Sequence, residues 1–255
     1  MNSDFDFSIV TVTFNCESTI EDTVSSVKAQ RGVTVQHVIK DGGSQDETAH
    51  NARRANGDCE IFVSSDAGIY DAMNQGFDRT RGRYVGFLNG DDKYIDESVL
   101  HDVAKVFEMH DCDFVFGGIV MAGRRSQAVR AWEDYRPPEQ IVRSGQLPHP
   151  ALFVRRDVLQ SIEGPFDAAL RIAGDLKLGL QLVVQMKAKG QPLRRPLVVM
   201  ALGGESTKSL RSYMLGWRES ALAYNEILSK GGWMFVSKKV LSKIPQLFRV
   251  VRPDS

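Results

Sequence analysis

Short apolar runs alternate with amphipathic helical patterns through the first half of the chain, and this alternation restricts the possible folds more than any other feature. Each run is rich in β-branched residues, and apolar side chains at helical spacing follow it after a short polar turn. Such chains form βαβ units, so we expect an α/β fold with a doubly wound, mostly parallel sheet and helices on both faces. The strands are expected at residues 7–14, 35–39, 61–63 and 84–88, and the helices at residues 20–27, 44–56, 69–80 and 98–109.

The starts of the first two helices match the capping box, in which a Ser or Thr and a Glu three residues later cap the helix reciprocally. The pattern occurs at residues 18–21 and 44–47. After strands expected at residues 114–120 and 128–132, the chain is rich in Arg, Gly and Pro. Strand character returns at residues 151–154 and 197–202, with a helix between them at residues 176–184.

Charge and cysteine content exclude several classes of protein. Lys plus Arg and Asp plus Glu number 32 each, whereas a general nucleic-acid binder shows a basic excess. The three cysteines are widely spaced and form no CxxC pair, so neither a disulfide framework nor a zinc site is expected. We see no signal peptide and no apolar run of about 18 residues, and therefore expect a cytoplasmic protein without a transmembrane helix.

Acidic residues follow three of the expected strands at the point where each strand ends. Asp41 follows the second strand, Asp66 the third, and Asp91 and Asp92 the fourth. Taken singly, each aspartate is equally typical of a turn. Because the carboxyl ends of parallel strands lie along one edge of a sheet, where ligands bind, these carboxylates should meet in one crevice. Clustered carboxylates repel one another unless a cation lies between them, and oxygen ligands favour Mg or Mn over zinc.

Four blocks of the sequence resemble glycosyltransferase family 2, in the order that the family shows. Residues 8–15 resemble its opening strand, residues 40–46 its Asp-Gly-Gly-Ser-x-Asp motif, and residues 82–92 the strand that carries its DxD-like motif. Residues 66–74 resemble the Gly-Ile-Tyr-Asp-Ala-Met-Asn block of a bacterial branch that builds surface polysaccharides such as colanic acid. The resemblance extends over about residues 7–207. It implies a GT-A fold and an inverting, metal-dependent transfer of a sugar from a nucleoside diphosphate sugar to a carbohydrate or lipid-linked saccharide.

The resemblance also implies roles for individual positions. Asp41 would hydrogen-bond the nucleotide base, and Asp91 would hold a Mn or Mg ion on the donor diphosphate. Asn89 stands where many members have the first aspartate of DxD, and its neutral oxygen would bind the metal more weakly. The donor-binding positions implied in this way are Thr13, Asp41, Asp66, Asp71 and Asn89.

On the acceptor side, residues 172–176 resemble the segment whose aspartate is the catalytic base, which implies that role for Asp175. From the residues alone, Asp175 is an aspartate at a helix N-terminus, where the helix dipole favours a negative charge. His149 begins a segment similar to the family's His-Gln-Ala-x-Phe, but Pro150 replaces the Gln. A contact of His149 with an acceptor or phosphate and an exposed loop histidine therefore both remain open. We assign no chemistry to the Gly-Gly-x-Ser loop at residues 203–206.

We expect the chain to divide into a catalytic domain and a short extension. Residues 1–207 would form the GT-A domain, with a nucleotide-sugar half up to about residue 115 and an acceptor half from about residue 116. Residues 208–255 would form a helical C-terminal extension.

The extension contains an amphipathic pattern. Trp233 and Phe235 precede apolar residues that recur at helical spacing from Val236 to Val251, with basic residues beside them. The segment from Trp233 to Val251 is suited to peripheral contact with the inner face of a membrane. A terminal helix that packs on the catalytic domain or on a second subunit is the alternative, and Pro245 interrupts the helix.

Two other functions use a related fold. A sugar nucleotidyltransferase needs a Gly-rich, basic loop after its first strand to hold a triphosphate, but residues 14–17 read Phe-Asn-Cys-Glu. The same turn excludes a GxGxxG dinucleotide site. A non-catalytic protein that binds nucleotide sugars is the second alternative, and fold resemblance alone does not distinguish it from an enzyme.

Overall fold

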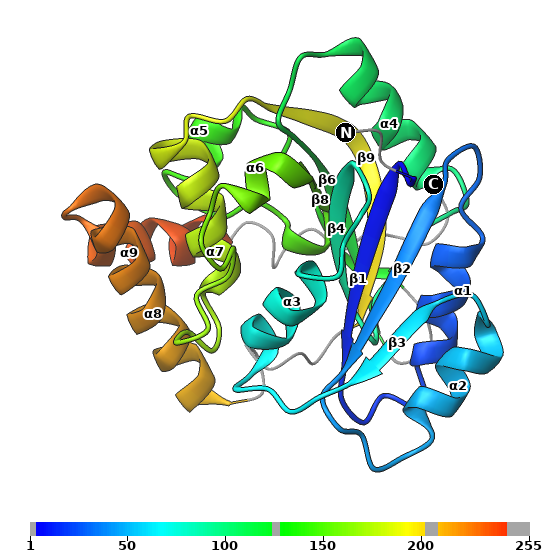
Figure 1. The fold of residues 1–255 in the computed structure, drawn as a ribbon. Coiled ribbons are helices and arrows are strands. Elements are labelled where there is room, and N and C mark those ends of the chain that lie inside the picture. The colour runs from blue at the N-terminus through cyan, green and yellow to red at the C-terminus, as the bar shows by residue number, and fades with distance from the viewer. Residues whose placement is uncertain (1–3, 124–127, 202–208, 244–255) are drawn as a thin grey trace.

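The computed structural model describes residues 4–123, 128–201 and 209–243. Its strands form one nine-stranded sheet in the order β3–β2–β1–β4–β8–β6–β9–β5, with β7 paired to β6 (Figure 1). The strands are β1 (Phe7–Thr13), β2 (Val35–Asp41), β3 (Glu60–Val63), β4 (Tyr84–Asn89), β5 (Lys93–Tyr94), β6 (Phe114–Ala122), β7 (Ala128–Trp132), β8 (Leu152–Arg155) and β9 (Gly190–Ala201). The α-helices are α1 (Ile20–Lys28), α2 (Thr48–Ala55), α3 (Ile69–Phe77), α4 (Val99–Met109), α5 (Pro138–Ile141), α6 (Arg156–Gln160), α7 (Gly174–Leu180), α8 (Leu210–Leu228) and α9 (Gly232–Lys243). A 3₁₀ turn, η1 (His149–Ala151), precedes β8, and a π-helical turn, η2 (Gln181–Gln185), follows α7.

The strands β1 to β4 form the parallel half of the sheet. All seven residues of β1 are buried, and β1 pairs in parallel with β2 on one side and with β4 on the other. β3 pairs in parallel with β2. The chain thus moves outward from β1 to β3 and returns to the far side of β1 at β4. The carboxyl ends of β1 and β4 therefore form the switch point at which open α/β sheets bind ligands.

The second half of the sheet is mixed. β8 is antiparallel to β4 and β6, β7 is antiparallel to β6, and β5 is antiparallel to β9, whereas β6 and β9 are parallel. The expected fold class is confirmed, with the parallel pairs confined to β1–β4 and β6–β9. β7 and β8 follow β6 without the long crossover helix that a parallel neighbour requires, and this accounts for the antiparallel pairs.

Helices cover both faces of the sheet (Figure 1). Val10 and Val12 of β1 face a core that they share with α3, α7, α8 and α9. Phe7 and Ile9 alternate with them along the strand and face a second core, which α4 covers. These two cores hold the central strands in place, and a smaller cluster of Ile20, Val24, Ile39 and Ala52 packs α1 and α2 on β2.

The expectation that Val236 begins a membrane-facing stripe, with Phe235 at the interface just before it, is wrong. They are only 1% and 5% exposed and pack in the same core as the central strands. The opposite side of α9 exposes Trp233 (62%) and Leu241 (62%). The apolar pattern of this helix arises mainly because one side packs on the rest of the chain. The expected stripe beyond Lys243, up to Val251, lies outside the described residues.

Both capping-box predictions are also wrong, for one shared reason. α1 begins at Ile20, so its N-cap is Thr19 rather than the predicted Ser18, and the Thr19 hydroxyl donates to the carbonyl oxygen of Gly90 at 2.9 Å without capping a backbone nitrogen. α2 begins only at Thr48, and the hydroxyl of Ser44 donates to Asp41 at 2.6 Å. Both hydroxyls connect loops that meet at the carboxyl edge of the sheet.

Candidate functional site

The carboxyl edge of the parallel half brings the first candidate residues together. Thr13 ends β1 directly beside Asp41, the last residue of β2, and Asn89 ends β4 beside Val12. Asp41 is 1% exposed. Its Oδ1 accepts hydrogen bonds from the backbone nitrogen of Ser44 at 3.0 Å and from the Ser44 hydroxyl at 2.6 Å. The orientation of this carboxylate is therefore fixed beside the switch point.

A buried lysine links the ends of β2 and β3. Lys40 is fully buried, and its ammonium group contacts the carboxylate of Asp66. The other oxygen of Asp66 accepts from the backbone nitrogen of Gly68 at 3.1 Å. A side chain at Gly42 would come within 3.1 Å of Asp66 and 3.5 Å of the Thr13 carbonyl oxygen, so these loops pack closely. Our sequence analysis missed Lys40, although a lysine inside a buried strand is rare unless its charge is paired.

Asp71 lies in the first turn of α3 and stabilises the start of that helix. Its Oδ2 accepts hydrogen bonds from the backbone nitrogen of Ala67 at 2.8 Å and from the Gln75 side chain at 3.1 Å. This position favours a carboxylate for local reasons, because a negative charge near a helix N-terminus is stabilising. A role of Asp71 in donor binding stays a prediction.

The turn after β4 separates an exposed aspartate from a buried one. Asp91 is exposed, whereas Asp92 is 1% exposed and accepts hydrogen bonds from the Asn89 amide at 2.9 Å and the Ala201 backbone nitrogen at 3.3 Å. Burial, reinforced by the charge of Asp91, raises the pKa of Asp92 to about 7. Asp91 is therefore the carboxylate of the pair that a ligand can reach, while Asp92 attaches the turn to the end of β9.

The donor atoms at this edge suit a hard cation that is shared with a ligand. Within the described ranges, no group of three or more His, Cys, Asp or Glu side chains is arranged to hold a metal ion. A cation at Asp91 would therefore complete its coordination with oxygen atoms of a bound ligand, as Mg commonly does with phosphates. The side-chain oxygens of Thr13 and Asn89 are buried there without a hydrogen-bond partner in the described part of the chain.

Asp175 lies at the start of α7 and is held by residues from two other segments. Its Oδ1 accepts from the backbone nitrogen of Leu176 at 2.8 Å and lies 3.4 Å from the Tyr70 hydroxyl, and its Oδ2 accepts from the Gln146 amide at 2.9 Å. Burial, reinforced by the charge of Asp175, raises the pKa of Tyr70, so the phenol remains a hydrogen-bond donor. The sequence analysis placed Asp175 at a helix start but missed Gln146.

His149 is buried rather than exposed on a loop. It is 8% exposed, its ring stacks on Phe87 with centroids 5.8 Å apart, and it makes a T-shaped contact with Phe166 at a centroid distance of 5.3 Å. Neither ring nitrogen has a hydrogen-bond partner among the residues that the structure describes. Burial lowers the pKa of His149, opposed by the charge of Asp175, so the ring is neutral near pH 7.

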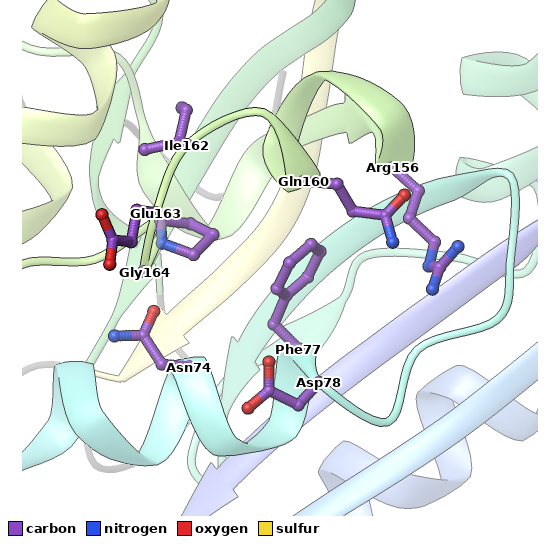
Figure 2. A pocket seen from close by; sticks show the side chains of 9 residues that line it. Asn74, Phe77, Asp78, Arg156, Gln160, Ile162, Glu163 and Gly164 are labelled. Carbon is purple, nitrogen blue, oxygen red and sulfur yellow. The ribbon is translucent and has the colours of Figure 1, made fainter.

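A cavity of about 460 Å³ lies apart from these residues. Figure 2 shows that the last turn of α3, with Asn74, Phe77 and Asp78, lines it together with Arg156 and Gln160 of α6. None of the candidate residues lines this cavity. Its walls include both acidic and basic side chains, and we assign the cavity no part in the site.

Comparison with known families decides the class of the chain. The sequence profile of glycosyl transferase family 2 matches residues 8–152, more than half of the chain. The chain belongs to this family. The matched region contains Asp41, Asp66 and Asp91 and ends before Asp175.

A relative matches a longer stretch of the chain than the family profile does. A PGL/p-HBAD biosynthesis glycosyltransferase of Mycobacterium bovis is 30% identical over 174 residues. The alignment covers 66% of this chain and 66% of the relative, just under two thirds of each.

Two solved structures share the fold. TarS 1-349 of S. aureus in complex with UDP-GlcNAc superimposes with a TM-score of 0.70 at 18% identity, covering 94% of this chain and 73% of that one. The mannosyltransferase PcManGT of Pyrobaculum calidifontis, in complex with GDP-Man and Mn²⁺, gives a TM-score of 0.64 at 12% identity, covering 96% and 79%. Among the helices that the structure describes, none has the length and apolarity to span a membrane.

Proposed function

We propose that the chain is an inverting, metal-dependent glycosyltransferase that moves a sugar from a nucleoside diphosphate sugar to a saccharide or lipid-linked saccharide in polysaccharide biosynthesis. One observation carries the proposal. Tyr70, which shortly follows Asp66 in the chain, donates to the carbonyl oxygen of Ile172 at 2.8 Å and approaches Asp175. This contact links the segment that follows Asp66 to the segment that carries Asp175, which supports a site shared by the two segments. Family membership supports the reaction class.

In the proposed reaction, Asp175 acts as the general base. Its carboxylate accepts the proton of an acceptor hydroxyl while that oxygen attacks the anomeric carbon. The bond between the anomeric carbon and the diphosphate oxygen breaks with its electron pair, and the nucleoside diphosphate leaves from the opposite face. A single displacement inverts the anomeric configuration without a covalent sugar–protein intermediate. Asp175 then returns the proton to solvent.

The donor would bind along the carboxyl edge of β1, β2 and β4. Asp41 would accept a hydrogen bond from the nucleotide base, and Asp66 and Asp71 would border the nucleoside. Asp91, with the amide oxygen of Asn89 nearby, would hold Mn or Mg on the diphosphate. When bound, that ion supplies positive charge against the charge that develops on the leaving group. TarS was solved with UDP-GlcNAc and PcManGT with GDP-Man and Mn²⁺, so uridine and guanosine donors are both candidates.

His149 would bind an acceptor hydroxyl or a phosphate oxygen. Buried polar groups are almost always hydrogen-bonded, yet both ring nitrogens of His149 lack a partner in the described part of the chain. A bound ligand would supply one. The influence of Asp175 on the pKa of His149 supports a location near the reacting groups.

Helix α9 would contact an anionic membrane surface with the side that faces away from the core. Trp233, Met234 and Leu241 are each at least 60% exposed on that side, and Lys238 is exposed among them. Amphipathic helices with exposed Trp and basic residues bind at membrane interfaces. Such a contact would bring the site to lipid-linked acceptors.

The function is tested by thermal shift with UDP-GlcNAc and GDP-Man, each with and without Mn²⁺, followed by measurement of nucleoside diphosphate release. One donor should raise the Tm in the presence of Mn²⁺, because a ligand that binds the folded state stabilises it by mass action. The same donor should be hydrolysed slowly, with water as the acceptor. EDTA and Asp91→Ala should each abolish release.

Asp78→Ala is the matched control for Asp91→Ala, because Asp78 is exposed and lies at the remote cavity. This variant should behave as the wild type does. A donor that raises the Tm but is never hydrolysed would favour the non-catalytic binding protein. Full activity in EDTA would refute the metal assignment.

A further inference from the structure

Helix α8 holds the backbone of the loop that leads into α7. Glu219 of α8 is 6% exposed, and its carboxylate accepts hydrogen bonds from three consecutive backbone nitrogens, those of Arg171, Ile172 and Ala173, at 2.8 to 3.2 Å. Consecutive backbone N–H groups that converge on one anion form a nest. Because buried N–H groups need an acceptor, this carboxylate fixes the conformation of the loop immediately before Asp175.

The same loop is restrained by Tyr70 of α3. The Tyr70 hydroxyl donates to the Ile172 carbonyl oxygen at 2.8 Å. A side chain added at Gly174 would lie 2.8 Å from the Tyr70 ring, so the backbone passes in close contact with the phenol. The loop is thus held by Glu219 and by Tyr70, and these two residues determine where the first turn of α7 places Asp175.

Helix α9 acts on the carboxylate of Asp175 through one intermediate residue. The ammonium group of Lys239 donates to Oε1 of Gln146, and Nε2 of the same amide donates to Oδ2 of Asp175 at 2.9 Å. Lys239 also lies 3.5 Å from the hydroxyl of Ser220 in α8. An ammonium only donates and a carboxylate only accepts. The amide of Gln146 must therefore present its oxygen to Lys239 and its nitrogen to Asp175.

We infer that helices α8 and α9 are part of the catalytic apparatus, with Glu219 and Lys239 as positioning residues for Asp175. This inference rests on the proposed role of Asp175 as the base. Glu219 sets the backbone before Asp175, and Lys239 fixes the orientation of Gln146 and so of the carboxylate. Helix α8 packs against α7, and α9 packs against α8 (Figure 1). They follow residue 152, where the match to the family profile ends.

The first test compares Lys239→Met with Lys230→Met. Lys230 is an exposed lysine just before α9, so it controls for the loss of a positive charge from this part of the chain. Donor hydrolysis is measured with whichever of UDP-GlcNAc and GDP-Man the wild type accepts. Lys239→Met should lower kcat about tenfold, because a misplaced catalytic group loses rate steeply, while the KM for the donor and the Tm stay near wild-type values. Lys239→Arg, which keeps hydrogen-bond donor groups at this position, should recover much of the lost kcat.

A double-mutant cycle separates positioning from a general effect. Gln146→Leu should reproduce the defect of Lys239→Met, and the double variant should be no slower than Gln146→Leu alone, because both residues act through one hydrogen-bond path. Additive losses would overturn the inference.

The variant Asp175→Asn separates a failure of this inference from a failure of the base assignment. If that variant is inactive while Lys239→Met and Glu219→Gln keep the wild-type kcat, the base assignment stands and the inference fails. Full activity of Asp175→Asn would instead reject the proposed role of Asp175 as the base, on which this inference rests.

Amide hydrogen exchange, measured without substrate, tests whether Glu219 holds the loop before Asp175. In Glu219→Gln one acceptor oxygen becomes an NH₂ group that faces backbone donors, so hydrogen exchange of the amides of Arg171, Ile172 and Ala173 should become faster by about tenfold or more. Lys230→Met should leave this exchange unchanged. Wild-type exchange rates in Glu219→Gln would show that the carboxylate does not hold the loop.

Discussion

The hydrogen bonds to Asp175 leave room for a substrate hydroxyl. A carboxylate has about four acceptor positions, and the described contacts come from Leu176, Gln146 and, at a longer distance, Tyr70. These contacts hold the group without saturating it. A base that is fixed in this way can accept a proton from a hydroxyl that approaches the remaining lone pairs.

Asp175→Asn tests this role because it keeps the size of the side chain and removes its basicity. Donor hydrolysis should fall by about a hundredfold or more, whereas the affinity for UDP or GDP, measured by calorimetry, should not change. Asp157→Asn serves as the control, because its carboxylate is exposed and pairs only with Arg155 and the backbone of α6 in the described contacts. Near-normal turnover in Asp175→Asn would show that Asp175 is not the base and only stabilises the start of α7.

The sequence located the candidate residues that follow strands but not those that act through tertiary contacts. Asp41 and Asp66 are recognisable because each follows a short run with strand character, and the direction of the strand determines the edge at which it ends. Gln146 and Glu219 lie 29 and 46 to 48 residues from the groups that they bond. Their roles depend on how α8 and the η1 segment pack, and no local pattern encodes this.

The strands were easier to predict than the helix caps. A buried strand such as β1 is specified by its own apolar, β-branched residues. Hydroxyl groups, in contrast, bond to whichever acceptor lies within reach. The hydroxyl of Thr19, at the start of α1, bonds to Gly90, and that of Ser44, the predicted cap of α2, bonds to Asp41. Capping patterns in loops that converge on a site are therefore poor guides to the contacts that their hydroxyl groups make.

The β1–β2 pair contains a histidine that makes stability depend on pH. His37 is buried beside Thr11, with 2.9 Å between its Nε2 and the Thr11 hydroxyl, and burial lowers its pKa to about 3. An exposed histidine in the unfolded chain titrates near pH 6.5. Between these values the unfolded chain binds the additional proton, so the free energy of unfolding should decrease as the pH falls below about 6.5.

His37→Gln should flatten this dependence, by up to about 1.4 kcal/mol per pH unit. Urea unfolding of both proteins between about pH 5 and 7.5 measures the slope, and the difference in slope is informative even if the variant is less stable throughout. His110→Gln, at the exposed end of α4, is the control and should keep the wild-type slope. Equal slopes for wild type and His37→Gln would show that His37 does not drive the effect.

At the scale of the whole molecule, the sequence leaves open where the helical extension lies. An apolar stripe looks the same whether it faces lipid or the rest of the protein. The structure places Phe235 and Val236 in the main core and leaves Trp233 and Leu241 exposed on the same helix. The exposed side chains are therefore the ones to examine for membrane contact.

Sedimentation with phosphatidylglycerol-containing vesicles tests that contact. The full chain should sediment with the vesicles at low salt and less at high salt, because each basic residue near an anionic surface contributes about 1 kcal/mol that salt screens. The double variant Trp233→Ser/Leu241→Ser should remain in the supernatant. Its Tm should match the wild type, since both side chains are 62% exposed and the core contacts of Phe235 are untouched. Phosphatidylcholine vesicles, which lack net charge, should bind the wild type weakly. A wild-type protein that stays in the supernatant with anionic vesicles at low salt would leave α9 with the role of positioning Asp175 alone.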